Sequence, residues 1–221
     1  MSIAHAKKRR CERDHQEILI GVTGHRTFAA GERSTAAVVA AELERIAVRH
    51  PDVEVTCITA LAEGTDRLVA RLARKILGAR IHVSLPMPAS AYEMDFATEA
   101  SRRTFRKMLA AAERVIEAPI LSRGRAWRRY TEERNHQYAW GGAYVARNAD
   151  ILLTIWDGTP ARGTGGTAFV VDWFLEGRTP RRYAMSRWTM TRAPSPAPGL
   201  LIHVDAETLR VRRRRRHLAN H

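Results

Sequence analysis

The residues of this sequence best suited to ligand chemistry lie in three glycine-containing segments, each after an apolar run: Thr23–Gly24–His25–Arg26, Glu63–Gly64–Thr65–Asp66 and Gly163–Thr164–Gly165–Gly166–Thr167. Glycine allows a ligand to approach the backbone closely. Free backbone amides where a loop enters a helix attract anions such as phosphate. The third segment is the most specific of the three, because two adjacent glycines leave room for a phosphate and Thr164 or Thr167 adds a hydroxyl.

Charged residues in the first two segments suggest more particular roles. Arg26 can form a charge-assisted hydrogen bond with a phosphate, although it also fits a plain turn with a solvated side chain. Glu63 can accept hydrogen bonds from ribose hydroxyls, as acidic residues do in dinucleotide sites. Asp66, taken alone, is better explained as a structural cap.

Other residues can complete a pocket around these segments. Pro86 follows an apolar run and can form part of an apolar wall, and Asp157 and Gly158 follow another. Arg134 near the start of a long predicted helix either points into the pocket or is solvated. A flap over the pocket, or a loop that merely turns, is expected around Tyr92, Asp95 and Phe96.

Several other chemistries find no support in the sequence. Cys/His clusters at metal-ligand spacing and a GxSxG nucleophile elbow are both absent, so we expect no metal and no serine hydrolase site. Cys57 lies in an apolar run and is expected to be a buried structural thiol. Trp140 and Tyr144 lie one helical turn apart and are most simply explained as core residues.

The elements that must position these residues are strands alternating with helices. The apolar runs predict strands at 16–23, 53–59, 81–85, 114–117, 151–156 and 200–204. Helical patterns occupy 35–49 with Ser34 as N-cap, 66–77 before Gly78, 98–112, 130–148 and 167–176. Paired glycines at 141–142 predict a close helix–strand contact. The alternation predicts an α/β, Rossmann-like, doubly wound and mainly parallel sheet flanked by helices. Ligands bind such sheets beyond the carboxyl ends of the strands, at the switch point.

Net charge divides the chain into a domain and two basic ends. The 221 residues carry a formal charge of +14, of which residues 1–16 hold +3 and residues 210–216 hold +6. We therefore predict a basic N-terminal tail at 1–16, one domain at 17–204 with an irregular excursion at 178–199, and an Arg-rich tail at 205–221. Such tails favour weak, sequence-independent contact with nucleic acid, although a solvated tail fits equally well.

Compartment follows from what the sequence lacks. Its N-terminus has no apolar signal region, and no apolar run approaches the roughly 18 residues of a membrane span. Two cysteines cannot build a disulfide framework. These features together predict a cytoplasmic protein without membrane contact.

Three longer stretches together resemble the SLOG superfamily, which includes the LOG enzymes, the DNA-processing protein A fold and YpsA-like proteins. These stretches are ILIGVTGHRTF, CITALAEGTDRLVA and ADILLTIWDGTPARGTGGTAFVVDWF, and the resemblance covers roughly residues 17–177. It implies a Rossmann-like domain that binds a nucleotide or nucleotide-derived ligand, and in many members a ligand sensor in a bacterial conflict system. It is also compatible with a homo-oligomer.

The resemblance implies that the pocket loops contain Gly24 with its neighbours, residues 63–66 and residues 165–167. One departure bears on catalysis. LOG phosphoribohydrolases carry a GGxGTxxE loop whose glutamate acts with an arginine, whereas here Val170 stands three positions after Thr167.

Three functions follow from these observations. Binding without catalysis is the expected function. An N-glycosidase acting on nucleoside 5′-monophosphates is the alternative, with candidate catalytic residues Glu63, Arg134 and Asp172. A nucleic-acid-binding protein using its basic tails is the second alternative.

Overall fold

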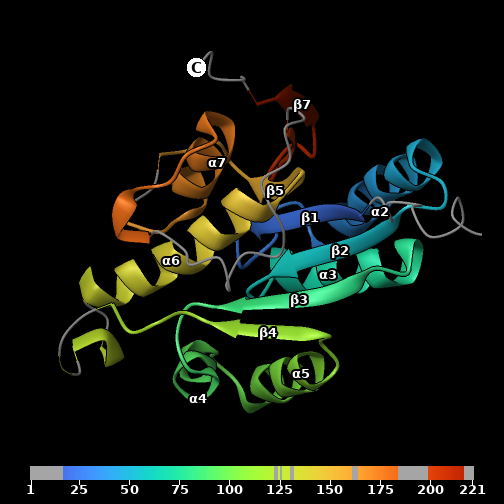
Figure 1. The fold of residues 1–221 in the computed structure, drawn as a ribbon. Helices are drawn as coiled ribbons and strands as arrows, with labels where there is room; N and C mark the ends of the chain where they lie inside the picture. The colour runs from blue at the N-terminus through green and yellow to red at the C-terminus, as the bar shows by residue number, and fades with distance from the viewer. Residues whose placement is uncertain are drawn as a thin grey trace, which may run out of the picture.

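A computed structural model of the protein describes residues 17–121, 124, 126–129, 132–160, 164–183 and 199–216. Its strands form one seven-stranded sheet in the order β4-β3-β2-β1-β5-β6-β7 (Figure 1). Neighbouring strands from β4 to β6 pair in parallel, and β7 pairs antiparallel with β6. The predicted α/β class with a mainly parallel sheet is therefore confirmed. The strands are β1 Glu17–Gly24, β2 Glu54–Thr59, β3 Arg80–Leu85, β4 Arg114–Glu117, β5 Ile151–Trp156, β6 Leu200–Asp205 and β7 Val211–Arg215.

Helices cover both faces of this sheet. On one face lie α6 and α7, drawn in yellow and orange in Figure 1, and on the other lie α2 and α3. The helices are α2 Glu32–Arg49, α3 Thr65–Leu77, α4 Ala89–Tyr92, α5 Glu99–Ala110, α6 Glu132–Asn148 and α7 Thr167–Glu176. Short 3₁₀ turns are η1 Glu93–Asp95, η2 Ala126–Arg128 and η3 Arg181–Tyr183.

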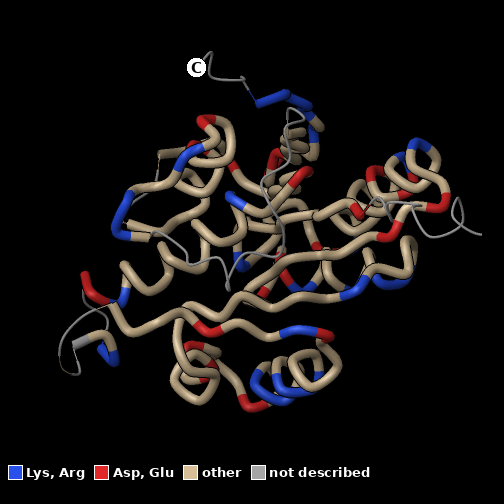
Figure 2. The backbone as a smooth tube through the Cα atoms, viewed as in Figure 1, with Lys and Arg blue, Asp and Glu red and all other residues tan. Residues whose placement is uncertain are grey.

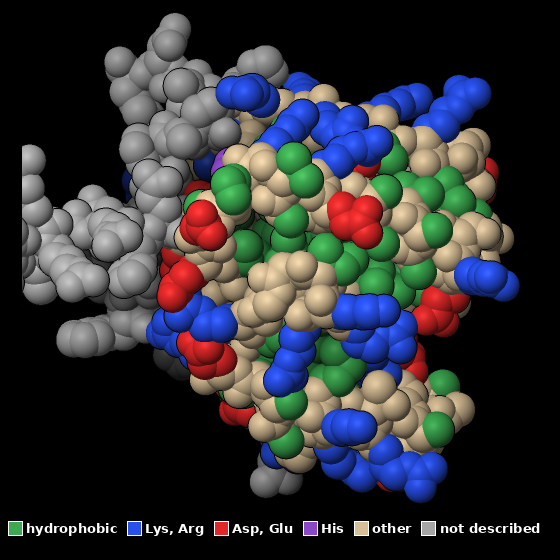
Figure 3. Space-filling view, turned by 90° about the vertical axis from the view of Figure 1, so that its right-hand side faces the viewer, with side chains coloured by type: hydrophobic (Ala, Val, Ile, Leu, Met, Phe, Trp, Pro, Cys, Tyr) green, Lys and Arg blue, Asp and Glu red, His purple; other side chains and the backbone are tan. Residues whose placement is uncertain are grey.

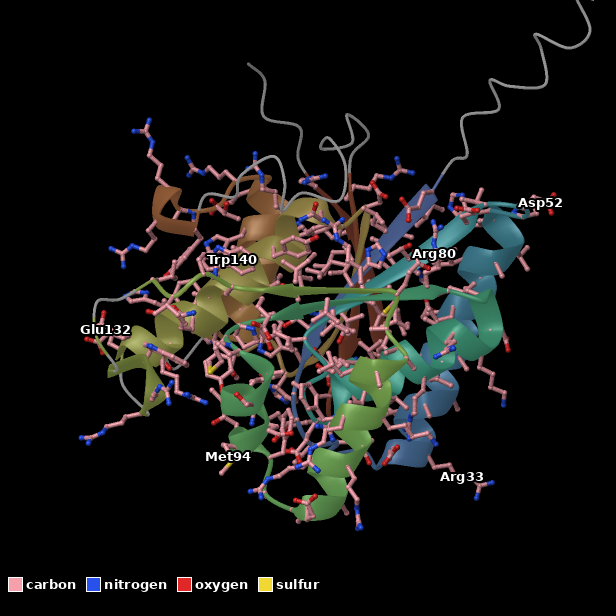
Figure 4. The ribbon with its side chains drawn as sticks, turned by 60° about the horizontal axis from the view of Figure 1, so that its bottom comes forward. Arg33, Asp52, Arg80, Met94, Glu132 and Trp140 are labelled. Carbon is pink, nitrogen blue, oxygen red and sulfur yellow. The ribbon has the colours of Figure 1, made fainter. Side chains whose placement is uncertain are left out.

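The apolar runs of β1, β2, β3 and β5 are continuous because each of these strands buries both of its faces. In β1, Leu19 packs with the α6 side and Ile20 with the α2 side, and both are fully buried. The predicted core positions on α6 are confirmed: the rings of Trp140 and Tyr144 stack 5.8 Å apart against the sheet (Figure 4 labels Trp140). Cys57 in β2 is likewise a buried free thiol.

Two glycines permit close approaches of the α6 layer to β1 and to α7. A Cβ on Gly21 of β1 would lie 2.8 Å from Ala149, so the strand and the end of α6 touch there. A Cβ on Gly142 would lie 2.6 Å from Val170 Cγ2 of α7. The helix–strand contact predicted for the pair Gly141–Gly142 is therefore wrong for Gly142. A Cβ on Gly141 would lie 3.6 Å from Pro86, the residue that follows β3, which is an ordinary contact distance. Gly142 serves a helix–helix contact, and the close helix–strand approach occurs at Gly21.

Helix ends follow the sequence signals in one case and depart from them in another. Gly78 ends α3 in the left-handed conformation, with φ 61°, as predicted. The predicted N-cap at Ser34 is wrong, because α2 begins at Glu32. Gly31, with φ 83°, turns the chain into the helix earlier, and the Thr35 hydroxyl donates to the Gly31 carbonyl oxygen over 2.8 Å.

The chain after β6 also differs from the predicted basic tail. Asp205 turns the chain by accepting hydrogen bonds from the amides of Glu207 and Thr208, at 3.1 and 2.8 Å. Val211–Arg215 then forms β7, visible as a run of arginines at the top of Figure 2. A run of charged residues carries no apolar alternation, which is why the sequence did not indicate this strand. The predicted N-terminal tail at 1–16, residues 217–221 of the predicted C-terminal tail and most of the excursion, at 184–198, lie outside the described residues.

Charge on the described surface is mixed in sign on the side shown in Figure 3, where Lys and Arg alternate with Asp and Glu and with apolar side chains. None of the helices in the described parts of the chain is long and apolar enough to cross a membrane.

Candidate functional site

A cavity of about 520 Å³ opens at the carboxyl ends of the parallel strands. It lies where the sheet order reverses between β1 and β5, the position at which open α/β sheets bind ligands. Small-molecule sites typically measure about 300–1,000 Å³. The lining residues come from five segments: Val22, Thr23, Gly24 and Arg26; Ala60, Ala62 and Asp66; Pro86 and Tyr92; Asn135, Tyr138, Gly141, Gly142 and Val145; Thr164, Gly165, Gly166, Thr167 and Val170.

The loop entering α7 forms one end of this cavity. Gly165 has φ 92°, and a Cβ there would lie 2.6 Å from the backbone nitrogen of Ala139 in α6, so the position requires glycine twice over. Gly166 is the N-cap of α7, with φ −72° and no side-chain cap. The first amides of α7 are thus left uncapped by a side chain. A helix start of this kind favours an anion.

The end of β1 is held by tight backbone contacts. A Cβ on Gly24 would lie 2.5 Å from the Ile155 carbonyl oxygen and from Thr65 Oγ1. The amide and hydroxyl of Thr65 both donate to the His25 carbonyl oxygen, at 3.0 and 2.9 Å. Gly64 has φ 73°, and a Cβ there would collide with the Arg26 backbone. Gly64 and Thr65 therefore hold the loop after β1 from outside the cavity lining, whereas Gly24 is part of the lining.

Arg26 brings a positive charge to the cavity wall. Among the described lining residues it is the one basic side chain. It interacts electrostatically with Tyr92 of α4, Asp95 of η1 and Tyr138 of α6. It also interacts with Asp66 of α3. This arrangement holds a guanidinium beside open space, where an ionised ligand group can reach it.

Arg134 takes a structural position instead of entering the cavity. Its side chain is 4% exposed and lies 2.6 Å from Asp95 Oδ1. Its Nη1 also donates to the Trp127 carbonyl oxygen over 3.0 Å. The Tyr138 hydroxyl donates to the other oxygen of Asp95. Arg134 thereby supports, through Asp95, the tyrosine that borders the cavity beside Arg26.

Asp66 lines the cavity from the start of α3, which follows β2, whereas the loop into α7 follows β5. Its Oδ2 accepts hydrogen bonds from Thr59 Oγ1 and the Ala60 amide, both at 2.9 Å, and from the Ala62 amide at 3.4 Å. Asp66 thus caps the end of β2, while Gly64 is the N-cap of α3. Burial raises the pKa of Asp66 to about 6, although these hydrogen bonds and the charge of Arg26 oppose the shift.

The other acidic candidates lie outside the cavity lining. Glu63 accepts a hydrogen bond from the Ser101 hydroxyl. Asp172 is exposed on α7, where partial burial and Glu176 raise its pKa. Asp157 lies 3.6 Å from His25 Nε2, and hydrogen bonding from Thr159 is the main cause that lowers its pKa.

His25 and Gly158 also fall outside the lining, and the residues considered for a flap do not form one. Tyr92 and Phe96 are buried core residues whose rings meet edge to face at 5.1 Å. Asp95 is held between Arg134 and Tyr138. Because these side chains are buried and paired, this segment forms a fixed part of the cavity wall and not a movable flap.

Residues of α6 form a wall that the sequence argument missed, namely Asn135, Tyr138, Gly141, Gly142 and Val145. These residues do not lie at strand ends, and α6 reaches the cavity only because it crosses the sheet. The paired glycines Gly141 and Gly142 were the feature of the sequence that could have indicated this wall, since small residues on a helix leave space beside the helix.

Within the described residues, no group of three His, Cys, Asp or Glu side chains can hold a metal ion. Comparison with protein-family models and with curated proteins found no match to this chain. The assignment of the site therefore depends on its geometry.

Proposed function

We propose that this protein binds a nucleotide or nucleotide-derived ligand in the cavity and acts as a ligand sensor. The observation that carries the proposal is the approach of Gly165 and Gly166 to the cavity at the start of α7. Backbone amides at such a helix start, in a cavity that Arg26 also lines, suit a phosphate. The resemblance of the TGHR, AEGTD and TGGT segments to the SLOG superfamily supports the nucleotide class and the sensor role.

Geometry favours binding over hydrolysis of a glycosidic bond. The residues considered for a phosphoribohydrolase, Glu63, Arg134 and Asp172, are all absent from the cavity lining. Arg134 is already paired with Asp95. A general acid or base must come within hydrogen-bond reach of the reacting group, so these three residues are poorly placed for the reaction.

Calorimetric titration of the protein with AMP, GMP, CMP, UMP and ADP-ribose tests the proposal. We expect at least one to bind and to raise the melting temperature, since a ligand at 100 times its Kd stabilises a fold by about 2.7 kcal/mol. Chromatography of the same mixtures tests the enzyme alternative, because hydrolysis would release free base. Absence of binding by every compound would refute the proposal.

A second candidate function, contact with nucleic acid, is favoured by β7. Arg212, Arg214 and Arg215 are exposed along this strand at the edge of the described sheet. Alternate residues of a strand lie about 6.6 Å apart, a spacing suited to repeated phosphate contacts. Binding of single- and double-stranded DNA that weakens steeply with salt, and weakens further in R212Q/R214Q, would support it. Salt-independent or unchanged binding would exclude it.

A further inference from the structure

The two carboxylate oxygens of Asp66 are used unequally. All three of its hydrogen bonds from Thr59, Ala60 and Ala62 end on Oδ2. No hydrogen bond from the described residues ends on Oδ1, although Asp66 is only 6% exposed. Oδ1 is not one of the fully enclosed polar atoms that lack a hydrogen-bond partner, so it keeps some accessible surface. Asp66 lines the cavity. Its unused lone pairs are therefore open to a molecule in the cavity.

The charged and titratable groups around Asp66 do not occupy this oxygen. Arg26 comes from the loop after β1, Cys57 from β2, Tyr92 from α4 and Arg67 from α3. Arg67 donates instead to the Leu61 carbonyl oxygen and to Ser101. A buried carboxylate that leaves lone pairs unused is costly, so a donor supplied by a ligand would be strongly favoured.

The position of Asp66 relative to α7 defines what such a ligand must span. Asp66 follows β2, the loop into α7 follows β5, and β1 lies between them. Two strand spacings amount to roughly 10 Å. That is the reach of a nucleoside 5′-monophosphate from its phosphate to its base.

We propose that Asp66 Oδ1 anchors the ligand by accepting a hydrogen bond from a hydroxyl or amino group, at the end of the cavity opposite Gly165 and Gly166. This inference rests on the proposed function and makes it more specific. The ligand class it selects has an anionic group at one end and an uncharged donor at the other. A second phosphate beside Asp66 would be repelled by the carboxylate.

The variant D66N tests this anchor. Three donors surround Oδ2, so the asparagine oxygen must take that position and the NH₂ group must replace Oδ1. The substitution therefore keeps the strand-end cap and turns the cavity-facing acceptor into a donor. E63Q is the matched control, because Glu63 lies three residues away and does not line the cavity.

Titrations use the tightest binder among AMP, GMP, CMP and UMP, together with its 2′-deoxy analogue and inorganic pyrophosphate. We expect D66N to bind the ribonucleotide at least tenfold more weakly than wild type, while E63Q binds within twofold. Pyrophosphate affinity should not fall in D66N, because only a negative charge is removed. A 2′-deoxy penalty seen in wild type and absent in D66N would identify ribose as the donor. Equal affinity of the analogue would exclude the 2′-hydroxyl and leave the 3′-hydroxyl or the base as the donor.

Two outcomes would overturn the inference and can be told apart. If wild type binds a ribonucleotide and D66N binds it within twofold, the anchor is refuted and the proposed function stands. If wild type binds none of the four nucleotides, the inference is refuted, and if it does not bind ADP-ribose either, the proposed function is refuted as well. Circular dichroism and the melting temperature of ligand-free D66N establish that the variant is folded in either case.

Discussion

Arg213 in β7 forms a two-point contact with Glu42 in α2: its Nε lies 3.0 Å from Oε2 and its Nη2 lies 2.6 Å from Oε1. The Glu42 side chain is 2% exposed, and Arg213 is 35% exposed. Arg45 also pairs with Glu42. This contact attaches the last described strand to a helix that lies 171 residues earlier in the chain.

R213A should therefore destabilise the fold. Removing the guanidinium leaves the buried Glu42 carboxylate with Arg45 alone, and we expect a loss of about 2 kcal/mol. R215A is the matched control, because Arg215 lies two residues further along β7 and is exposed. It should change the free energy of unfolding by less than about 0.5 kcal/mol. Urea denaturation measures both, and similar losses in the two variants would contradict the assigned role of the ion pair.

Neighbouring glycines at the start of α7 should respond differently to substitution. G165A should destabilise the fold by about 2 kcal/mol or more, because Gly165 has φ 92° and its Cβ would meet the Ala139 backbone. G166D should fold normally, since φ −72° suits any residue. Its carboxylate should lower nucleotide affinity more than tenfold by repelling phosphate. Thermal melts and calorimetry separate the two effects, and unchanged affinity in folded G166D would move the anion site elsewhere.

Arg26 should matter for charged ligands in particular. R26Q should weaken a nucleoside 5′-monophosphate by about 10–100-fold and the matching nucleoside by less than about twofold, because only the charge-assisted contact is lost. Arg33 provides the control: it lies in the first turn of α2, and Figure 4 shows it pointing outward. R33Q should bind both compounds as wild type does. Equal losses for nucleotide and nucleoside in R26Q would argue against a phosphate contact.

Stability of the ligand-free protein should depend on pH through Asp66. Burial raises its pKa from 3.8 to about 6, so the folded state favours the protonated form. The stabilisation is present below pH 4 and is lost as the pH rises through 6. A shift of this size corresponds to about 3 kcal/mol. Urea denaturation of wild type and D66N at pH 4 and pH 7 should show wild type losing most of that free energy of unfolding relative to the variant. Parallel changes in the two proteins would be incompatible with a raised pKa.

Segments with apolar periodicity were predictable from sequence, and contacts between distant polar residues were not. The bounds of β4, β5 and α7 match their predicted ranges. Apolar residues define all three locally, and glycines at 158, 166 and 177 add to the signal at β5 and α7. The position of β7 depends on pairing with β6 and on the contact of Arg213 with Glu42.

The same distinction holds at the candidate site. The glycine segments indicated which strand ends meet, and Gly24, Gly165 and Gly166 do line one cavity. Arg134 was misjudged because its partner Asp95 lies 39 residues away in the sequence. The asymmetric use of the Asp66 oxygens depends on how the chain turns after β2, which spacing alone does not reveal.

The edge position of β7 has a practical consequence for handling the protein. Removing the arginine-rich end would expose the backbone of β6, whose Leu201, Ile202 and Val204 are buried. An uncovered apolar edge strand is a template for aggregation, whereas arginines on the outermost strand oppose it. Truncation before Val211 should therefore lower solubility. The arginines of β7 oppose self-association, whether or not they also bind a partner.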